Sequence, residues 1–493
     1  MTTVPISRPP LAWALGSQLM LATLALYGAV SLPGLEAHWK FSATGIALFV
    51  LWLGVAGATA WMLSRAVPSR EQLAMLALGI VALRLCFEAL VLGRLSTGDA
   101  DIYPVIARQL LAGQGLYFDQ TDMGERVFAF YPPFYPVLLA AWGAVAGFST
   151  WSLIAMDMVV DCGAAWLIVQ IGAALNAPAA GRSAAFLYLV WQSVLFSAPL
   201  AQKEGVAIAL ILLLALVWIR QSQQTTSGWR GALALGVPTG LLAMTQPGQA
   251  PLAALFGLML VGRIGVRRLI RFGLAGACFA VVVMLPWWVR NWAIFGAFVP
   301  LTSAGGISLW IGNNPDATGN WMSQPKAWRG LPEIDYARRA RDEAVAWIKG
   351  HPADFVRLTV AKFLHAVGVG RFGLFRLAIM SPSLSPALSA MLFPLSFGAH
   401  WLMLGAGAVS LRLRQVPGIW VMTLLLIAGF VQLALFGVWF EFGERHREFL
   451  TPFLLLLGCM AGDGRNSKGA PNKNIQFKLS NTIRLLRRLI TGA

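Results

Sequence analysis

Long runs of apolar residues, separated by polar connections, dominate the chain. A bilayer-spanning helix needs about 17–25 such residues, because an unsatisfied backbone group is costly in hydrocarbon. The pair 231–245 and 248–262 is short, and is either two thin spans or a re-entrant hairpin. We therefore expect an all-α polytopic membrane protein with about 12 transmembrane helices. They are predicted at 11–31, 43–64, 74–93, 150–174, 183–199, 204–220, 231–245, 248–262, 270–289, 388–411, 417–440 and 447–462.

The charges between these runs predict the side on which each loop lies. Loops rich in Lys and Arg stay in the cytoplasm. With the N-terminus inside, most of the 21 acidic residues fall on the outer side. Both termini are then cytoplasmic. The predicted inner loops hold Arg65, Arg70, Arg182, Arg220, Arg230, Arg263, Arg267, Arg268, Arg271, Arg412 and Arg414.

Two predicted outer segments, 94–149 and 290–387, are much longer than a connection requires. Within the second, 331–350 and 355–367 have the periodicity of amphipathic helices lying along the interface. The division we expect is an extra N-terminal transmembrane hairpin at 1–73, a transmembrane core at 74–462 and a basic cytoplasmic tail at 463–493. An amphipathic stretch in that tail, 477–490, predicts an inner-leaflet anchor.

Composition narrows the class of protein. Of 493 residues, 57% are hydrophobic and 12% are charged, about half the charged fraction of a soluble protein. A soluble enzyme, a disordered scaffold and a disulfide-rich secreted module are therefore excluded. The net charge of +17 is explained by anionic lipid head groups, so we expect membrane lipids and no nucleic acid as partners. The four cysteines lie in apolar runs and indicate no metal or redox site.

The first outer segment carries the most informative chemistry. Asp99 and Asp101 follow the third predicted span directly, and a short amphipathic helix begins there. One carboxylate can deprotonate an incoming hydroxyl, and two together can hold a hard cation against a phosphate. Two solvated loop acids would give the same pattern. The motif is therefore weak when it is taken alone.

Charged groups near other predicted outer ends strengthen it. The pair Lys203-Glu204 lies at the depth of a lipid phosphate, and Arg290 follows Pro286-Trp287 at the end of a span. The cluster Arg445-His446-Arg447 stands on an otherwise acidic face, which suggests an anionic ligand. An ordinary interfacial ion pair at Lys203 and an arginine extending to the interface at position 290 remain open alternatives.

Two further features have both structural and functional interpretations. Asp157 and Asp161 lie one turn apart inside a predicted span, where carboxylates must face the protein interior or a wet cavity. They are either structural acceptors or supports for the site. The segment Gly312-Asn313-Asn314-Pro315 indicates a turn first and a sugar-binding site second.

Taken together, these motifs resemble the GT-C superfamily of membrane glycosyltransferases, in particular its protein-mannosyltransferase and aminoarabinose-transferase-like branch. The resemblance covers about residues 74–462, the predicted core. It rests on the order of Gly98-Asp99-Ala100-Asp101-Ile102-Tyr103, Gln114-Gly115-Leu116-Tyr117, Tyr131-Pro132-Pro133-Phe134-Tyr135-Pro136, Pro286-Trp287, Arg290-Asn291, Phe295-Gly296-Ala297-Phe298-Val299-Pro300, Gly305-Gly306, Gly312-Asn313-Asn314-Pro315, Arg445-His446-Arg447 and Pro452.

The resemblance implies a GT-C-like fold in the bacterial inner membrane, with its site on the periplasmic face. Such enzymes pass a sugar from a polyprenyl-phosphate donor to a hydroxyl of a glycan, lipid or protein. It also implies that Asp99 is the base and Glu204 a second acid, and that Asp101 shares any Mg²⁺ or Mn²⁺ with Asp99. No other cofactor is expected. The implied donor-phosphate residues are Tyr103, Tyr131, Lys203, Arg290, Asn291, Arg445, His446 and Arg447.

The chain departs from the family pattern at three positions. Many relatives have Asp-Glu where Asp99-Ala100 stands, so Asp101 would supply the second carboxylate. The aminoarabinose transferases have a Lys where Tyr131 stands, so another cation must neutralise the phosphate. A Tyr is common where this chain has His446. The first two predicted spans lie outside the usual core.

Two other functions compete with the transferase. A secondary transporter or flippase also has about twelve spans and intramembrane acids, but its chemistry lies near the midplane and its sequence often repeats. An O-antigen ligase or polymerase shares the lipid-linked donor, but generally has one dominant late loop. The long early loop that carries Asp99 favours the transferase.

If Asp99 is the general base, the change Asp99→Asn should lower sugar transfer by about 10²–10⁴-fold while folding and donor binding persist. Asp101→Asn should have a smaller effect, unless a cation is bound there. Turnover would be followed with purified protein and a lipid-linked sugar. Wild-type turnover by Asp99→Asn would remove Asp99 from this role.

Overall fold

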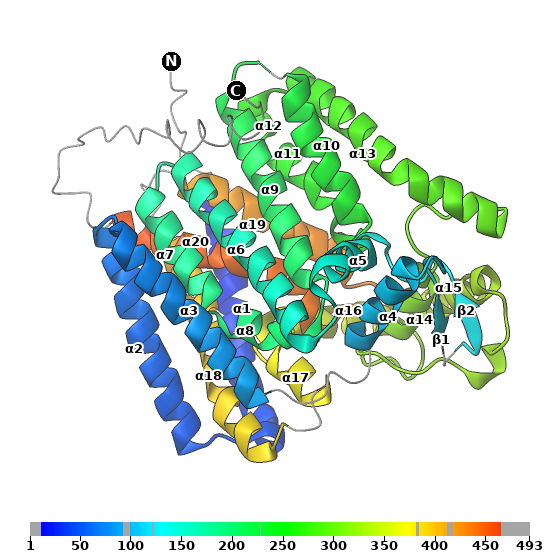
Figure 1. Cartoon of the computed structure of the whole chain (residues 1–493), viewed down its shortest axis with the longest axis horizontal. Helices are drawn as coiled ribbons and strands as arrows, with labels where there is room; N and C mark the ends of the chain where they lie inside the picture. The colour runs from blue at the N-terminus through cyan, green and yellow to red at the C-terminus, as the bar shows by residue number, and fades with distance from the viewer. Residues whose placement is uncertain are drawn as a thin grey trace.

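A computed structural model describes residues 11–91, 99–120, 123–226, 228–380, 384–411 and 418–464. Almost all of its regular structure is helical (Figure 1). Eight described helices are long and apolar enough to cross a bilayer, as expected for a multi-pass membrane protein. They are α1 (Leu11–Trp39), α2 (Ala43–Arg65), α3 (Arg70–Val91), α6 (Thr150–Ala174), α9 (Glu204–Gln223), α13 (Val266–Phe295), α18 (Pro386–Ser410) and α19 (Ile419–Gln432), which a π-helical turn extends to Gly437.

The other predicted spans form shorter helices, so the count of about 12 is not confirmed. The run 183–199 is divided between α7 (Pro178–Leu189) and α8 (Gln192–Ser197), because Trp191 takes an extended backbone conformation. The pair 231–262 becomes α10 (Trp229–Ala243), α11 (Leu252–Met259) and α12 (Val261–Ile264), with a 3₁₀ turn at Pro247–Gln249. The last predicted span is α20 (Thr451–Gly464).

The bundle is most deeply buried around α9, α18 and α19, where 61% of the apolar window is buried against 17% in α2 and α3. A single large apolar cluster joins α6, α7, α9, α19 and α20. Figure 1 shows α2 and α3 at one edge of the bundle and α13 at the opposite edge. The boundaries of the predicted hairpin, core and tail remain predictions. The tail beyond residue 464 lies outside the described residues.

The two long predicted outer segments fold against each other (Figure 1). The first forms α4 (Asp99–Leu111), the antiparallel strands β1 (Phe118–Gln120) and β2 (Glu125–Val127), and α5 (Phe134–Ala146). The second forms α14 (Ala304–Gly312), α15 (Glu333–Gly350), α16 (Pro352–Gly368) and α17 (Leu374–Met380). The helices predicted at 331–350 and 355–367 are confirmed as α15 and α16. Apolar residues of the hairpin, α14 and α15 share one core: Met123, Val127, Ile307, Trp310, Ile311, Trp328, Tyr336, Ala340 and Ala344.

Glu333, the first residue of α15, joins these segments through hydrogen bonds. Its buried carboxylate accepts from the backbone N–H groups of Phe128 and Ala129 at 2.5 and 2.9 Å, and from the Ser303 hydroxyl. A carboxylate that accepts several donors holds them strongly. The loop that leads into Tyr131-Pro132-Pro133 is therefore fixed by a residue about 200 positions away.

The change Glu333→Ala should destabilise the protein by about 1–3 kcal/mol, because it leaves the buried N–H of Ala129 and the partly buried N–H of Phe128 without an acceptor. Thermal unfolding in detergent would measure the loss. The control is Asp335→Ala on the same helix, where the ion pair with Arg338 is exposed and the expected change is within about 0.5 kcal/mol. Equal effects of the two changes would contradict the role of Glu333.

Candidate functional site

The predicted acids Asp99 and Asp101 begin α4, but their side chains lie outside the described residues. The next described side chains of that helix locate it. Tyr103 is 2% exposed, and its ring centroid lies 5.7 Å from that of Tyr131 and 5.1 Å from that of Tyr135. The start of α4 is therefore packed against the loop and helix that follow the hairpin.

Lys203 lies beside this aromatic group. Its Nζ is 5.8 Å from the centroid of the Tyr103 ring, in the range of a cation–π contact. Lys203 is the N-cap residue of α9, and Glu204 is the first helical residue. The structure thus brings together Tyr103, Tyr131, Lys203 and Glu204, which are far apart in the sequence.

Behind Glu204 is a small cavity of about 30 Å³, lined by four carboxylic acids: Asp157 and Asp161 of α6, Glu204 of α9, and Glu448. Ser193 and Tyr188 also line it. Glu448 belongs to the 3₁₀ helix Glu444–Leu450. Acids in such a space can exchange protons and attract a cation. Asp157 and Asp161, which the sequence left with two interpretations, therefore face a cavity shared with Glu204.

A buried arginine on α3 neutralises one of these acids. Arg84 Nη2 lies 2.5 Å from Asp161 Oδ2, and both side chains are at most 3% exposed. The Tyr188 hydroxyl donates to the other oxygen of Asp161 at 3.4 Å. Sequence reasoning missed Arg84 and the fully buried Glu88. Their spacing, two charged residues one turn apart inside an apolar run, is the pattern that could have identified them as functional candidates.

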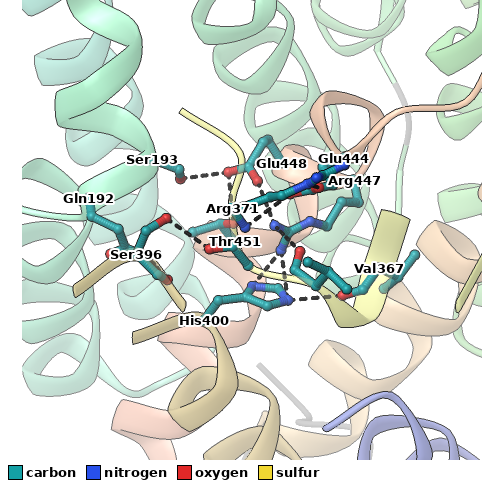
Figure 2. Close-up of polar contacts among 12 residues, drawn as sticks. Gln192, Ser193, Val367, Arg371, Ser396, His400, Glu444, Arg447, Glu448 and Thr451 are labelled. Atoms are coloured by element: carbon teal, nitrogen blue, oxygen red, sulfur yellow. Dashed lines mark hydrogen bonds and ion pairs between the residues drawn. The ribbon is translucent and has the colours of Figure 1, made fainter. Parts of the chain in front are cut away.

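A second buried network surrounds Glu448 (Figure 2). Arg447 Nη2 lies 3.3 Å from Glu448 Oε1 and donates to the carbonyl of Val369. The Ser193 hydroxyl donates to Glu448 at 2.6 Å. His400 Nε2 lies 2.9 Å from the carbonyl of Val367, so its N–H donates there and Nδ1 accepts from Arg447. Arg447 is 3% exposed and is held by protein groups. Sequence reasoning missed His400.

Next to it, Arg371 pairs with Glu444 at 2.6 Å and also donates to it through its backbone N–H (Figure 2). Burial raises the pKa of Glu444, although the guanidinium groups of Arg371 and Arg447 act against that rise. Burial, together with the nearby charge of Arg371, lowers the pKa of His365 to about 4. These contacts join the end of α16 to the 3₁₀ helix that precedes α20.

The cluster Arg445-His446-Arg447 does not act as one surface. Arg445 pairs with Glu441 at 3.2 Å, and His446 stacks on Phe442, with centroids 5.5 Å apart. His446 Nδ1 also lies 3.4 Å from the amide nitrogen of Gln246. Only Arg447 reaches the wall of the cavity, through its pair with Glu448.

Arg290 and Asn291 lie elsewhere, at the end of α13. The Arg290 guanidinium is 4.6 Å from the centroid of the Trp287 ring and donates to the carbonyl of Leu116 and to Asn291 Oδ1. Asn291 donates to the carbonyl of Val299 at 2.9 Å. These bonds tie α13 to the first outer segment.

The segment Gly312-Asn313-Asn314-Pro315 forms a turn. Asn313 and Asn314 are at most 3% exposed and donate to the carbonyls of Leu309 and Trp310. Lys362, which sequence reasoning missed, donates to the carbonyl of Gly312 at 3.1 Å and to that of Phe440 at 3.2 Å. Burial lowers the pKa of Lys362 to about 8.

Among the described side chains, no group of three His, Cys, Asp or Glu has the geometry to hold a metal ion. Asp99 and Asp101 are not among these side chains. Two carboxylates suit Mg²⁺ or Mn²⁺, and the divalent cation remains a prediction for these two residues.

No protein-family model matches the chain, and no curated protein does. Solved structures give partial likenesses. The oligosaccharyltransferase AglB of Archaeoglobus fulgidus, with an inhibitory peptide and a dolichol-phosphate, is 14% identical, with a TM-score of 0.44 over 84% of this chain and 54% of that chain. ArnT of Cupriavidus metallidurans, bound to undecaprenyl phosphate, is 15% identical, with a TM-score of 0.35 over 80% and 78%.

The chain thus spans about half the length of the archaeal protein it matches. All these TM-scores are below 0.5, and all sequence identities are below one in six. The likeness therefore assigns neither the ligands nor the activities of those proteins to this chain.

The buried charge of Lys362 predicts a pH dependence of stability. Its pKa is about 8 in the folded protein against an ordinary 10.5, so between these values the unfolded chain binds more protons. The stability contribution of this group therefore rises as the pH increases from about 8 to 10.5, and below pH 8 the full cost of burying the charge remains. Unfolding temperatures of the parent and Lys362→Met would be compared across this range, and the parent should gain relative to the variant. A difference independent of pH would contradict this.

Proposed function

We propose that the protein is an integral-membrane glycosyltransferase that moves a sugar from a polyprenyl-phosphate donor to a hydroxyl of a cell-envelope glycan, lipid or protein. The observation that carries the proposal is the meeting of α4, Lys203 and Glu204. The Lys203 side chain contacts Tyr103, four residues after Asp99, and Glu204 lines a cavity with three other acids. A cation and an acid beside the helix that begins with the proposed base suit transfer from a phosphate to a hydroxyl.

The roles follow from this chemistry. Asp99 removes the proton from the acceptor hydroxyl, and the acceptor oxygen attacks the anomeric carbon. Lys203 neutralises the phosphate that leaves with the bonding electrons. Glu204 is the second acid beside that phosphate. If Asp99 and Asp101 hold Mg²⁺ or Mn²⁺, the cation would supply further neutralising charge.

Among the candidate phosphate cations, position favours Lys203. The sequence alone ranks Arg290 first, Arg445 second and Lys203 third, because arginine can bind phosphate through two parallel hydrogen bonds. In the structure Arg290 lies at the end of α13 beside Trp287, whereas Lys203 is next to Glu204 at the start of α9. Lys203 is half-buried beside Tyr103. Since Lys203 stands next to the proposed second acid, it can take the place of the lysine that is missing at Tyr131.

The location proposed for this activity is the periplasmic face of a bacterial inner membrane, with both termini in the cytoplasm. The end of α3 and the start of α9 lie on the outer side in the charge-based topology. A polyprenyl phosphate brings its charge to that interface, where burying it without a cation would be costly.

One observation favours a transporter or flippase as a second candidate. Arg84, Asp157 and Asp161 are charged groups within candidate spans, a feature that proton pathways share. A transporter would move its substrate without breaking a covalent bond, so chemistry separates the two functions.

The test is to incubate the purified protein in lipid nanodiscs with polyprenyl phosphates carrying different sugars and a mixture of envelope acceptors. Mass spectrometry would follow the loss of sugar from the donor. For at least one donor in the panel, we expect free polyprenyl phosphate and a glycosylated acceptor as products. Heat-denatured protein should give neither product. Intact donors across the panel, together with uptake into vesicles, would support the transporter instead.

The phosphate assignment predicts that Lys203→Gln weakens donor binding by about 1.5–3 kcal/mol, the range for a charge-assisted hydrogen bond. Arg290→Gln and Arg445→Gln should have smaller effects. Binding of a polyprenyl-phosphate sugar would be measured at fixed ionic strength. Lys349→Gln, an exposed change on α15, is the control for lost surface charge. Donor binding by Lys203→Gln equal to that of the parent would place the phosphate elsewhere.

A further inference from the structure

Asp157 and Asp161 lie one turn apart on α6, and both side chains line the cavity. Two carboxyl groups that face the same point in a low dielectric do not both ionise, so a proton on one of them is favoured. Both groups face the start of α9, where a Cβ on Gly205 would lie 3.5 Å from Asp157 Oδ1 and 3.9 Å from Asp161 Oδ1. The proton therefore lies beside the residue that follows Glu204.

Charged and titratable groups surround the pair on every side. Arg84 of α3 is bound to Asp161, and Tyr188 of α7 donates to it. Glu88 of α3 is fully buried and makes no hydrogen bond with any described residue. Tyr135 of α5 packs in one apolar cluster with Met156 of α6 and Val206 of α9. Glu204 and Glu448 complete the cavity, and Arg447 is bound to Glu448.

The cavity brings Asp157 and Glu204 close to two acids that each have a cation, because Arg84 is paired with Asp161 and Arg447 with Glu448. Neighbouring carboxylates in a low dielectric cannot all ionise. The cavity between them, about 30 Å³, is large enough for a water molecule, which needs about 10–15 Å³. A proton can therefore cross it.

We propose that Asp157 and Asp161 form a proton-sharing pair that exchanges its proton with Glu204 across the cavity. Asp157 is the donor of the two, since Asp161 is held as a carboxylate by Arg84. Glu204 then receives a proton from the interior of the bundle as well as from solvent. This assigns the pair a proton-transfer function beyond the structural support that the sequence suggested.

The use of this proton rests on the proposed function. The acceptor oxygen bonds to the anomeric carbon, and the bond from that carbon to the phosphate oxygen breaks with its electron pair on the phosphate. The acceptor proton passes to Asp99, while Glu204 gives a proton to the leaving phosphate and is reloaded from Asp157. Asp99 releases its proton to solvent, and the pair takes one up, so that protons and charge balance over a cycle.

The first test is Asp157→Asn, which keeps a hydrogen-bond donor toward Asp161 but has no transferable proton. Transfer should fall by about 10²-fold, the size of a lost proton transfer, and its pH profile should change while donor binding persists. Asp157→Glu should recover part of the activity. Ser197→Ala, at the wall of the same cavity, is the control and should transfer like the parent. A parent-like rate and pH profile in Asp157→Asn would overturn the proton-transfer role.

The second test does not depend on sugar transfer. Infrared spectroscopy of the parent should show the absorption of a protonated carboxyl group that shifts in D₂O and disappears in Asp157→Asn. Absence of that band from the parent would overturn the proton-sharing pair. A band in a protein that transfers no sugar from any donor would keep the pair and reject the proposed glycosyltransferase.

Discussion

The structure depends on the pairing of buried arginines with buried carboxylates inside an apolar helix bundle. Breaking a buried ion pair on one side costs about 3–5 kcal/mol, because the remaining charge has no partner. The Arg84–Asp161 pair joins α3 to α6, and the Arg447–Glu448 pair lies where the contacts of α8, α18 and the 3₁₀ helix before α20 meet. Both pairs border one cavity. The compensation that stabilises the bundle therefore also places four acids around the start of α9.

The two long predicted outer segments have the complementary role, which is to pack α4 beside Lys203 at the start of α9. Glu333 fixes the loop before Tyr131, and Lys362 fixes the turns at Gly312 and Phe440. The aromatic rings of Tyr103, Tyr131 and Tyr135 then fill the space between α4 and α5. The proposed site thus lies at helix ends, where a lipid-linked substrate can reach it from the membrane interface. The acids of the cavity lie on its inner side and can supply it with protons.

Hydrophobic periodicity predicted the long spans and the helices α15 and α16, because these elements follow local patterns. It overestimated the length of α7 and α11, which are bounded by Trp191 and by the turn at Pro247. The partners of Arg84, Glu333 and Lys362 could not be predicted, since they lie 30 to about 200 residues away. Of the candidate site, Lys203, Glu204 and Tyr103 were named from the sequence, whereas burial of Arg447 and use of Arg290 by neighbouring groups required the structure.

In the proposed function, a lipid-linked phosphate binds between α4 and the start of α9. Cryo-electron microscopy of the protein in nanodiscs with polyprenyl phosphate would locate that phosphate. We expect it within hydrogen-bond distance of Lys203 Nζ, with the Asp99 side chain facing the same space. A phosphate bound at Arg290 or between other helices, away from Lys203 and Glu204, would contradict it.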